Sequence, residues 1–372
     1  RQNLLHRSMK IRSLTLRDFR NIASLSVSFH ESITVLVGDN AQGKTNLLEG
    51  IYFLSTGRSH RVNDELLCIR HGAETALIKG TIENSAPFEL KVVLHQEGKS
   101  LFYQHTALRR ASEFIGKMNA VLFSPGDMEL FDASPKARRR FMDTELGKIN
   151  PVYVDLLSKT MKLLKDRNTI LKEKTIDEAY LEVVTERMIT TQVDLIRLRT
   201  AFIREVNASL DRYYKLLSLS TDSIRIDYLG CVPDSEGVEG LLREKYARHL
   251  ERDKFMKVTG VGIHRDDLAF TMNDVPVSDI ASQGQRRMIV IALKCALLEV
   301  IEAAIGEKPI LLLDDVFSEL DASRRKALFQ TLHQNTQTII STTDLDHVSE
   351  WLSEAVTIYE VSAGKIRERK QL

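Results

Sequence analysis

A glycine-rich segment near the N-terminus has residue types and spacing that can bind phosphate. A strand-like apolar run leads into Gly38, four residues intervene, and Gly43-Lys44-Thr45 opens a helical pattern. Glycines at these positions permit a tight backbone path that turns successive N–H groups toward an anion. The helix start adds unpaired N–H groups and the positive end of its dipole. We therefore predict a nucleotide site in which Lys44 reaches the β- and γ-phosphates and the Thr45 hydroxyl ligates Mg²⁺. The residues predicted to contact the nucleotide here are Gly38, Asp39, Asn40, Ala41, Gln42, Gly43, Lys44, Thr45 and Asn46.

Two adjacent carboxylates near the C-terminus suit the same chemistry. The apolar run 310–313 is short enough for a fully buried parallel strand, and it ends in Asp314 and Asp315. In a phosphate-loop protein such a strand is expected to lie beside the first strand and to deliver an acid to magnesium. Asp314 is predicted to hold Mg²⁺ through water, and Asp315 to polarise the attacking water. Two acids that merely solubilise a strand end are the alternative, which the phosphate loop in the same chain disfavours.

A third segment, Ala281-Ser282-Gln283-Gly284-Gln285-Arg286-Arg287, precedes a helix expected from Met288 to about Ile305. Ser282 is a good N-cap, and Gly284 lets the backbone approach an anion closely. A small polar loop with glycine at a helix start indicates a second anion site.

The elements that must position these groups begin with a hairpin. Residues 9–16 and 23–29 alternate apolar with polar side chains, which predicts a half-buried antiparallel pair. Between them, Arg20 and Asn21 belong to a polar turn that either is solvated or contacts the base or ribose. The basic loop 57–61 either is solvated or lets Arg58 or Arg61 face the phosphates or DNA.

A long central stretch has a helical pattern. Residues 152–173 and 176–217 contain almost no glycine and form a predicted helical hairpin, whose second helix would span roughly 60 Å. Its apolar spacing predicts a heptad seam with a stutter, as in a short antiparallel coiled coil. Further strands are expected at 75–82, 88–95, 118–123 and 223–229, and a further helix at 236–258.

Two charged clusters need an explanation. Ser134 and Pro135 begin a helix that carries Lys136, Arg138, Arg139 and Arg140, a basic patch that requires open solvent or an anionic partner. His264, Asp266 and Asp267 could suggest a metal site, but adjacent strand residues point to opposite faces. A hydrogen-bonded polar cluster is therefore the favoured interpretation of the second group.

Composition sets the remaining limits. The 372 residues suffice for two lobes, and a net charge of +1 with 28% charged residues means that nucleic-acid binding must use local patches. Cys68, Cys231 and Cys295 form no CxxC pair, which argues against a disulfide framework and a cysteine zinc site. No apolar run approaches about 18 residues, so a cytoplasmic protein is expected. Residues 1–8 are interpreted as an extension upstream of the natural start at Met9.

The order of the motifs carries a resemblance. A phosphate loop, a long insertion, Ser-x-Gly-Gln before a helix and an acidic strand resemble the ABC-type ATPase head, whose signature loop is usually Leu-Ser-Gly-Gly-Gln. Within that class the sequence resembles the RecF family of bacterial recombination mediators. The matching segments are Phe19-Arg20-Asn21, Gly57-Arg58-Ser59-His60-Arg61, His264-Arg265-Asp266-Asp267, Ser282-Gln283-Gly284-Gln285-Arg286 and 311–321.

The resemblance implies an α/β fold: an ABC-type ATPase head with a mixed-sheet phosphate-loop lobe and a mainly helical second lobe that carries a short antiparallel coiled-coil arm. The expected divisions are 9–120 and 301–372 for the ATPase lobe, and 121–300 for the second lobe, with its arm at about 151–217 and its signature motif at 281–287.

It also implies a mechanism. ABC-type heads dimerise on ATP, so Ser282, Gln283, Gly284 and Gln285 would contact nucleotide held by the phosphate loop of a second copy, with Ser282 acting at the γ-phosphate. Segment 318–321 resembles the loop that couples the two sites. The sequence departs from the common signature at Gln283, and Thr343 stands where transporter heads place a switch histidine. Slow hydrolysis is therefore expected.

The family role is to help place RecA on gapped or double-stranded DNA, with RecO and RecR, as an ATP-dependent homodimer that needs ATP and Mg²⁺. The expected DNA surface comprises Arg109, Arg110, Lys136, Arg138, Arg139 and Arg140. The alternatives are the energising ATPase subunit of a membrane transporter and an architectural protein that nucleotide merely stabilises.

Overall fold

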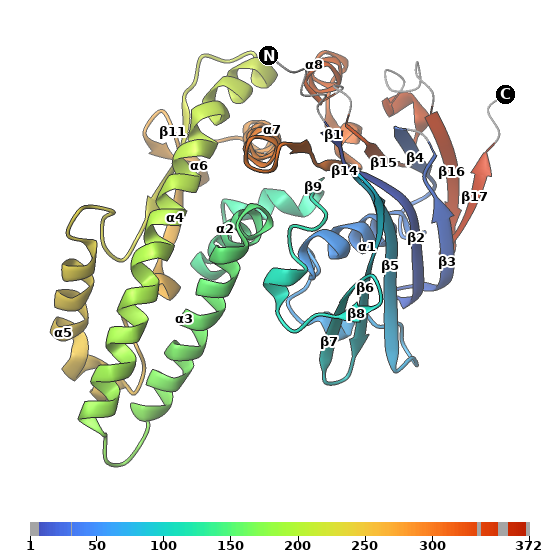
Figure 1. The fold of residues 1–372 in the computed structure, drawn as a ribbon. Coiled ribbons are helices and arrows are strands. Elements are labelled where there is room, and N and C mark those ends of the chain that lie inside the picture. Colours follow the sequence, from blue (N-terminus) through green and yellow to red (C-terminus); the bar gives the residue numbers. More distant parts are fainter. Residues whose placement is uncertain (1–6, 31, 333–335, 349–355, 370–372) are drawn as a thin grey trace. The chain divides into compact units, whose positions relative to one another are not determined.

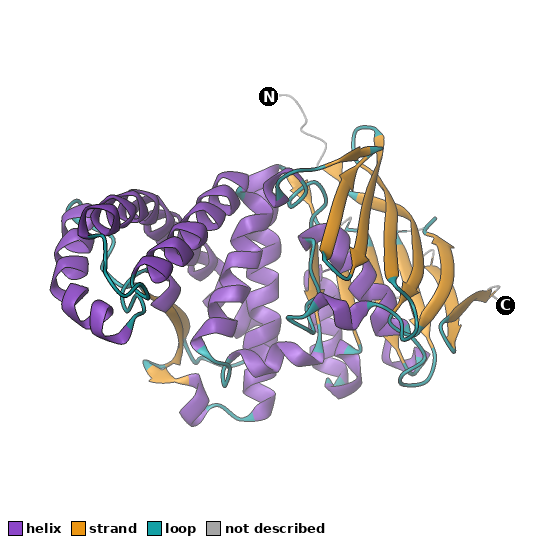
Figure 2. Ribbon diagram, turned by 90° about the horizontal axis from the view of Figure 1, so that it is seen from below, coloured by secondary structure: helices purple, strands orange, loops and turns teal. Residues whose placement is uncertain are grey.

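The chain forms two compact units in a computed structural model that describes residues 7–30, 32–332, 336–348 and 356–369 (Figure 1). Unit 1 comprises Arg1–Met128, Arg212–Thr221 and Gln283–Leu372, and unit 2 comprises Glu129–Asp211 and Asp222–Ser282. Unit 2 is therefore shorter at both ends than the expected second lobe, 121–300, and the assignment of the units as functional lobes stays a prediction. Most strands belong to unit 1, whereas unit 2 consists mainly of helices. Figure 2 colours helices and strands separately.

One six-stranded sheet of unit 1 carries the phosphate loop. Its order is β17 (Lys365–Arg369), β16 (Val356–Ser362), β4 (Ile33–Val37), β15 (Thr338–Thr342), β14 (Ile310–Asp314) and β9 (Ala120–Phe123). All neighbours are parallel except the antiparallel pair β16–β17. The prediction that the acidic strand lies beside the phosphate-loop strand is wrong, because the fully buried β15 pairs with both and separates them.

The second sheet of unit 1 is antiparallel. Its order is β3 (Ile22–Ser28), β2 (Lys10–Phe19), β5 (Thr75–Glu83), β6 (Pro87–His95), β7 (Gly98–Tyr103) and β8 (Thr106–Ala107). The predicted hairpin is confirmed as β2–β3, with alternating burial that places one face in the core. Residues 1–6 of the expected extension lie outside the described residues, whereas β1 (Arg7–Ser8) pairs with β13 (Glu307–Lys308).

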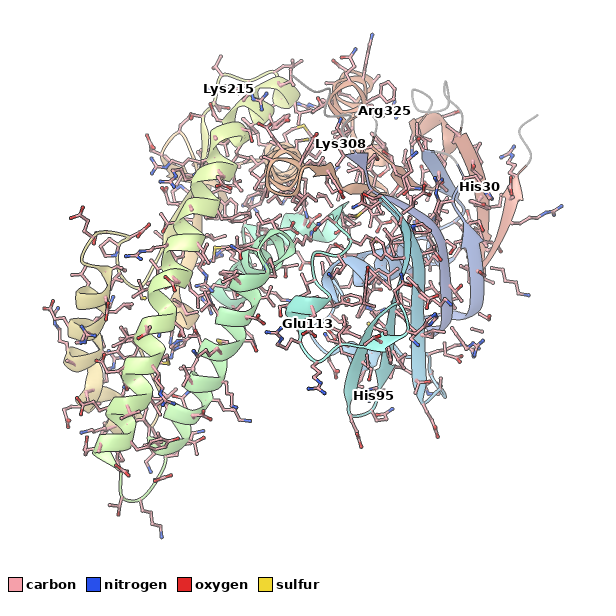
Figure 3. The ribbon with its side chains drawn as sticks, in the orientation of Figure 1. His30, His95, Glu113, Lys215, Lys308 and Arg325 are labelled. Atoms are coloured by element: carbon pink, nitrogen blue, oxygen red, sulfur yellow. The ribbon has the colours of Figure 1, made fainter. Side chains whose placement is uncertain are left out.

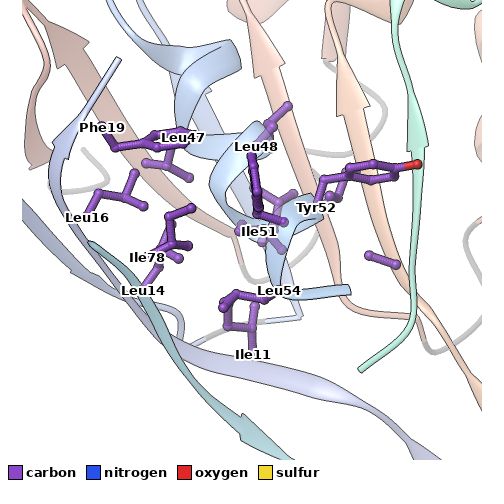
Figure 4. Close-up of a cluster of buried hydrophobic side chains, with 14 of the residues drawn as sticks. Ile11, Leu14, Leu16, Phe19, Leu47, Leu48, Ile51, Tyr52, Leu54 and Ile78 are labelled. Atoms are coloured by element: carbon purple, nitrogen blue, oxygen red, sulfur yellow. The ribbon is translucent and has the colours of Figure 1, made fainter. Parts of the chain in front are cut away.

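Helix α1 (Lys44–Thr56) contacts strands of both sheets. A helix that is apolar nearly all round is a buried helix, and Leu47, Leu48, Ile51 and Leu54 of α1 are fully buried. Figure 4 shows these side chains against Ile11, Leu14, Leu16, Phe19 and Ile78 of the antiparallel sheet. This packing fixes the helix whose first turn follows the phosphate loop.

Unit 2 contains α2 (Pro135–Ile149), α3 (Pro151–Ile170), most of α4 (Glu178–Ser218) and α5 (Val238–Met256). The predicted helical hairpin is confirmed as α3 and α4, which pack through Ile170, Leu171, Leu181 and Val184. Helix α5 packs along them as a third helix, which the heptad pattern did not predict (Figure 1). A buried Arg167–Asp253 ion pair of 2.8 Å connects α5 to α3. A three-stranded sheet, β10 (Ile224–Leu229), β11 (Asp267–Met272) and β12 (Val275–Pro276), completes the unit.

The remaining elements are 3₁₀ helices, labelled η, and further α-helices. They are η1 (Glu65–Cys68), η2 (Ala111–Glu113), η3 (Pro125–Leu130), η4 (Ile263–Arg265), α6 (Val277–Ile280), α7 (Gln283–Ile305), η5 (Val316–Glu319), α8 (Ala322–Leu332) and η6 (Leu345–Val348). Helix α7 begins at Gln283, earlier than the expected Met288, so Gly284 and Gln285 lie in its first turn. The three cysteines are free. Within the described ranges, no helix combines the length and apolarity needed to cross a membrane.

Candidate nucleotide site

The phosphate loop, residues 38–45, connects β4 to α1 and has a backbone that glycine alone can provide at two positions. A Cβ on Gly38 would lie 2.3 Å from the carbonyl oxygen of Val361, and Gly43 has a left-handed φ of 115°. The amides of Ala363 and Gly364 donate to the side-chain and backbone oxygens of Gln42 at 2.7 and 2.9 Å. The loop is therefore anchored to the β16–β17 turn, a contact that the sequence did not reveal.

The start of α1 is open to an anion. Gly43 provides no side-chain cap, and no acidic residue lies in the first turn of this helix. The first-turn N–H groups therefore keep the capacity to bind a phosphate, which is favoured at this end of the helix dipole. The site fits a nucleotide phosphate on this ground.

The Lys44 side chain is hydrogen-bonded to the backbone of the phosphate loop. Its Nζ donates to the carbonyl oxygens of Gly38 at 2.5 Å and Asp39 at 2.8 Å. Burial lowers the pKa of Lys44, and the nearby carboxylates of Asp315, Asp314 and Asp39 oppose this effect. The ammonium group therefore lies where it can bind an anion held by the same loop.

Thr45 and Asp314 lie together. The Thr45 hydroxyl donates to Oδ1 of Asp314 at 3.0 Å, and the Ser341 hydroxyl donates to the same oxygen at 2.5 Å. Burial raises the pKa of Asp314, while the two hydroxyl donors lower it. A hydroxyl and a carboxylate are oxygen donors of the kind that Mg²⁺ takes beside phosphates. Ser341 had no role predicted from the sequence, because its contact depends on the position of strand β15.

Asp315 occupies the strand end in a strained conformation. Its φ is 51°, in the left-handed region that a non-glycine residue seldom adopts. Its buried Oδ1 has no hydrogen-bond partner among the described residues. An acceptor of this kind, next to the phosphate loop, is free to take a proton from a water molecule.

The two candidate residues of the hairpin turn, Asn21 and Arg20, have different partners. Asn21 lies at the phosphate loop, where its Nδ2 donates to the Ala41 oxygen at 3.4 Å and its Oδ1 accepts from Asn46 at 2.8 Å. Arg20 instead donates to both carboxylate oxygens of the fully buried Glu49, at 2.9 and 2.6 Å. The Arg20 guanidinium is thus held by the protein itself, and Glu49 is a structural residue that sequence reasoning missed.

The signature segment is accessible. Ser282, Gln283 and Gly284 are exposed, and a Cβ on Gly284 would meet no atom within 4 Å. Gln285 is half-buried at the start of α7. The glycine is therefore not required by packing within the described part of the chain, and its backbone is open to an external group.

The basic residues predicted to bind DNA differ in their exposure to solvent and in their hydrogen-bond partners. Helix α2 begins as predicted, with Ser134 as its N-cap and Pro135 in its first turn. Lys136 is exposed, but Arg138 donates to both carboxylate oxygens of Asp267 at 2.7 Å and Arg139 donates to the backbone oxygen of Asp266. Arg140 is half-buried.

In unit 1, Arg109 and Arg110 are exposed, and Arg110 pairs with Glu113, which Figure 3 labels. Of the predicted DNA surface, Arg109, Arg110 and Lys136 are thus the residues most open to solvent.

His264, Asp266 and Asp267 are each hydrogen-bonded, as favoured from sequence, but to different partners. Asp266 accepts from Arg199 at 2.7 Å and from the hydroxyl of Tyr228, while Asp267 accepts from Arg138. The His264 ring contacts the Thr259 oxygen at 3.0 Å. No group of three or more His, Cys, Asp or Glu side chains in the described ranges could hold a metal ion.

Comparison with known proteins supports one family. The family described as RecF/RecN/SMC N terminal domain matches residues 10–367. The chain is 39% identical over 363 residues to the DNA replication and repair protein RecF of Streptococcus gordonii, which covers 96% of this chain and all of that protein. It is 38% identical over 370 residues to the protein of the same description from Halalkalibacterium halodurans, covering 97% of this chain and all of that one.

Solved structures support the same family. A structure of the recombination mediator protein RecF with ATP in the RecFOR pathway has a TM-score of 0.90 and 28% identity, covering 99% of this chain and 100% of that one. The Smc head domain from Pyrococcus furiosus, at a TM-score of 0.54 and 15% identity over 97% of this chain and 96% of that one, shows likeness of fold alone. The fold is that of an ABC-type ATPase head with a mainly helical second lobe, and the chain belongs to the RecF family of DNA replication and repair proteins.

Proposed function

We propose that the chain binds ATP with Mg²⁺ at the phosphate loop, dimerises on ATP, hydrolyses it slowly and binds gapped or double-stranded DNA during recombinational repair. The observation that supports ATP and Mg²⁺ binding is the 3.0 Å hydrogen bond between Thr45 and Asp314, beside an uncapped helix start. A hydroxyl and a carboxylate that lie together are the ligands that a magnesium ion on a nucleotide would use.

Each residue at the site has a distinct task. Lys44 and the first-turn N–H groups of α1 bind the phosphates, and Thr45 with Asp314 would hold the metal ion. Magnesium, when bound, neutralises the charge that develops on the β- and γ-phosphates. Asp315 orients a water molecule and accepts its proton, since its unpartnered Oδ1 is the acceptor available there.

Slow hydrolysis is expected from the residue that follows β15, Thr343. Thr343 is exposed and uncharged, so it offers no cationic contact to a γ-phosphate. ATP in this proposal acts more as a clamp between subunits than as fuel.

The dimer rests on the exposed signature. Ser282 and the backbone at Gly284 are open to solvent, as residues that contact nucleotide on a second copy would have to be. Segment 318–321 begins close to the proposed catalytic base, because the Ser318 hydroxyl donates to the backbone oxygen of Asp315 at 2.9 Å. A signal between the two sites of a dimer has a physical path there.

The DNA role draws on the relatives. Proteins 39% and 38% identical to this chain are described as acting in DNA replication and repair, and a structural neighbour as a recombination mediator in the RecFOR pathway. We propose RecR and RecO as partners on this ground, and RecA as the partner that the family resemblance implies. The work would take place in the cytoplasm, where the DNA lies.

The test is mass in solution. Light scattering with saturating ATP and Mg²⁺ is expected to show dimers, and without nucleotide the dimer fraction should fall. Lys44→Ala should abolish the ATP effect, whereas Lys365→Ala, an exposed change on β17, should preserve it. Monomers of the unaltered chain under saturating ATP and Mg²⁺ would contradict the clamp.

A further inference from the structure

A buried ion pair joins the signature helix to the segment after β9. Nζ of Lys294, on α7, lies 2.9 Å from Oδ1 of Asp127, and the two side chains are 7% and 20% exposed. The other carboxylate oxygen of Asp127 accepts a 2.7 Å hydrogen bond from the backbone N–H of Ser124. Asp127 thus connects Lys294 to the point where β9 ends.

That point lies at the nucleotide edge of the sheet. Phe123 pairs with Leu313 in the parallel β9–β14 ladder, so Ser124 follows β9 where Asp314 follows Leu313. The ion pair therefore joins α7, through Ser124, to the end of β9. The neighbouring end of β14 carries the predicted metal-binding and catalytic carboxylates.

A pocket lies between the two joined elements. On α7 it is lined by Arg287, Val290 and Ile291, and across from them by the Phe123–Met128 segment, with Asp315 and Val316 completing the wall. Lys294 follows Arg287, Val290 and Ile291 by seven, four and three residues, which places it on the same face of α7. The ion pair therefore lies beyond Ile291 along the face of α7 that lines the pocket, while Asp315 lines the pocket itself.

We propose that Lys294 and Asp127 are a positioning pair that holds α7 at a set distance from the end of β9, and so sets both the pocket beside Asp315 and the presentation of the signature segment. This inference rests on the proposed ATPase function. Neither residue contacts nucleotide in the proposal, and both act through α7 and Ser124.

The chemistry favours positioning over mere stability. Burying two charges incurs a desolvation penalty that their attraction often only balances, so a buried pair is a weak source of stability compared with an apolar pair of equal size. A charge-assisted contact is directional, however, and fixes distance and register better than apolar packing does. Helix α7 is continuous from Gln283 to Ile305, so fixing Lys294 also fixes the first turn.

The test is the neutral double variant Lys294→Met with Asp127→Asn. It removes both charges together, and the asparagine amide oxygen remains as an acceptor for the Ser124 N–H. We expect a thermal melting temperature and an ATP affinity close to those of the unaltered chain, with single-turnover ATP hydrolysis and ATP-dependent dimer formation each reduced about tenfold or more.

A matched control is the buried Lys148–Glu145 pair of α2, whose side chains are 0% and 4% exposed. Its neutral double variant, Lys148→Met with Glu145→Gln, should dimerise and hydrolyse ATP as the unaltered chain does. If the Lys294–Asp127 double variant also does so, the pair is only structural and the inference is wrong. If the unaltered chain itself neither hydrolyses ATP nor dimerises on it, the proposed function fails instead.

Discussion

The Thr45 hydroxyl donates a 3.0 Å hydrogen bond to Oδ1 of Asp314, although 269 residues separate the two in the chain. They come from the first turn of α1 and the end of β14, and β15 lies between β14 and the strand that carries the phosphate loop. Ser341 of that intervening strand donates to the same oxygen at 2.5 Å. Three elements from distant parts of the sequence therefore converge on one carboxylate.

The variant Asp314→Asn should lose magnesium-dependent ATP binding. Asparagine keeps a side-chain oxygen for Thr45 and Ser341 but lacks the charge that attracts the metal ion. We expect its ATP affinity, measured by titration with a fluorescent ATP analogue, to be the same with Mg²⁺ as with EDTA. The exposed change Asp346→Asn serves as the control. An undiminished effect of Mg²⁺ on Asp314→Asn would show that another residue holds the ion.

The variant Asp315→Asn should separate binding from hydrolysis. Loss of a general base lowers the rate by about 10²- to 10⁴-fold, while Lys44 and the start of α1 still bind the phosphates. ATP-dependent dimers should therefore persist for hours, followed by light scattering after excess ATP is removed. Dimers that decay as fast as those of the unaltered chain would argue against Asp315 as the base.

Local patterns account for what could be predicted. The phosphate loop, the acidic strand and the α3–α4 hairpin were predictable because the pattern of each lies in contiguous residues. Features that depend on pairing between distant segments could not be predicted, such as the position of β15 between β4 and β14. Arg20 shows the same limit, since its buried partner Glu49 appears in sequence as an ordinary acid within a helix.

The variant Arg20→Met should reduce stability more than nucleotide affinity. It removes the bidentate partner of Glu49, a carboxylate with no exposed area, and breaking such a pair costs about 3 kcal/mol in the free energy of unfolding. Denaturant unfolding with and without ATP would measure both effects. The half-exposed Arg12–Glu83 pair is the control, because Arg12→Met should cost much less stability than Arg20→Met. A normal stability with a large loss of ATP affinity would favour a nucleotide contact for Arg20.

DNA binding should depend on the exposed basic residues. Charge reversal at Lys136 or Arg109 is expected to weaken duplex binding and to reduce its salt dependence by about one released ion for each phosphate that the variant no longer neutralises. Nucleotide affinity should be spared. Arg138→Ala should instead lower stability, because it leaves Asp267 without its bidentate partner. Unchanged duplex binding in both charge reversals would place the DNA surface elsewhere.

His60 should make unit 1 sensitive to mild acid. Burial lowers the pKa of His60 to about 4, with Glu49 and Asp127 opposing this effect and Arg61 and Lys294 adding to it. Its Nδ1 has no hydrogen-bond partner among the described residues, and its ring lies edge-on to Tyr52 at 5.4 Å. The folded protein therefore keeps this histidine neutral at pH 7.

The sign of the effect follows from the unfolded state, in which histidine has a pKa of about 6.5. Between about pH 6.5 and 4 the unfolded chain binds the proton and the folded chain does not, so stability falls as pH decreases, by about 2 kcal/mol at pH 5. His60→Gln should lose less stability than the unaltered chain between pH 7 and pH 5, measured by urea unfolding. His30→Gln, at the exposed position labelled in Figure 3, should follow the unaltered chain. Parallel curves for His60→Gln and the unaltered chain would show that His60 accepts its proton equally well in the folded state.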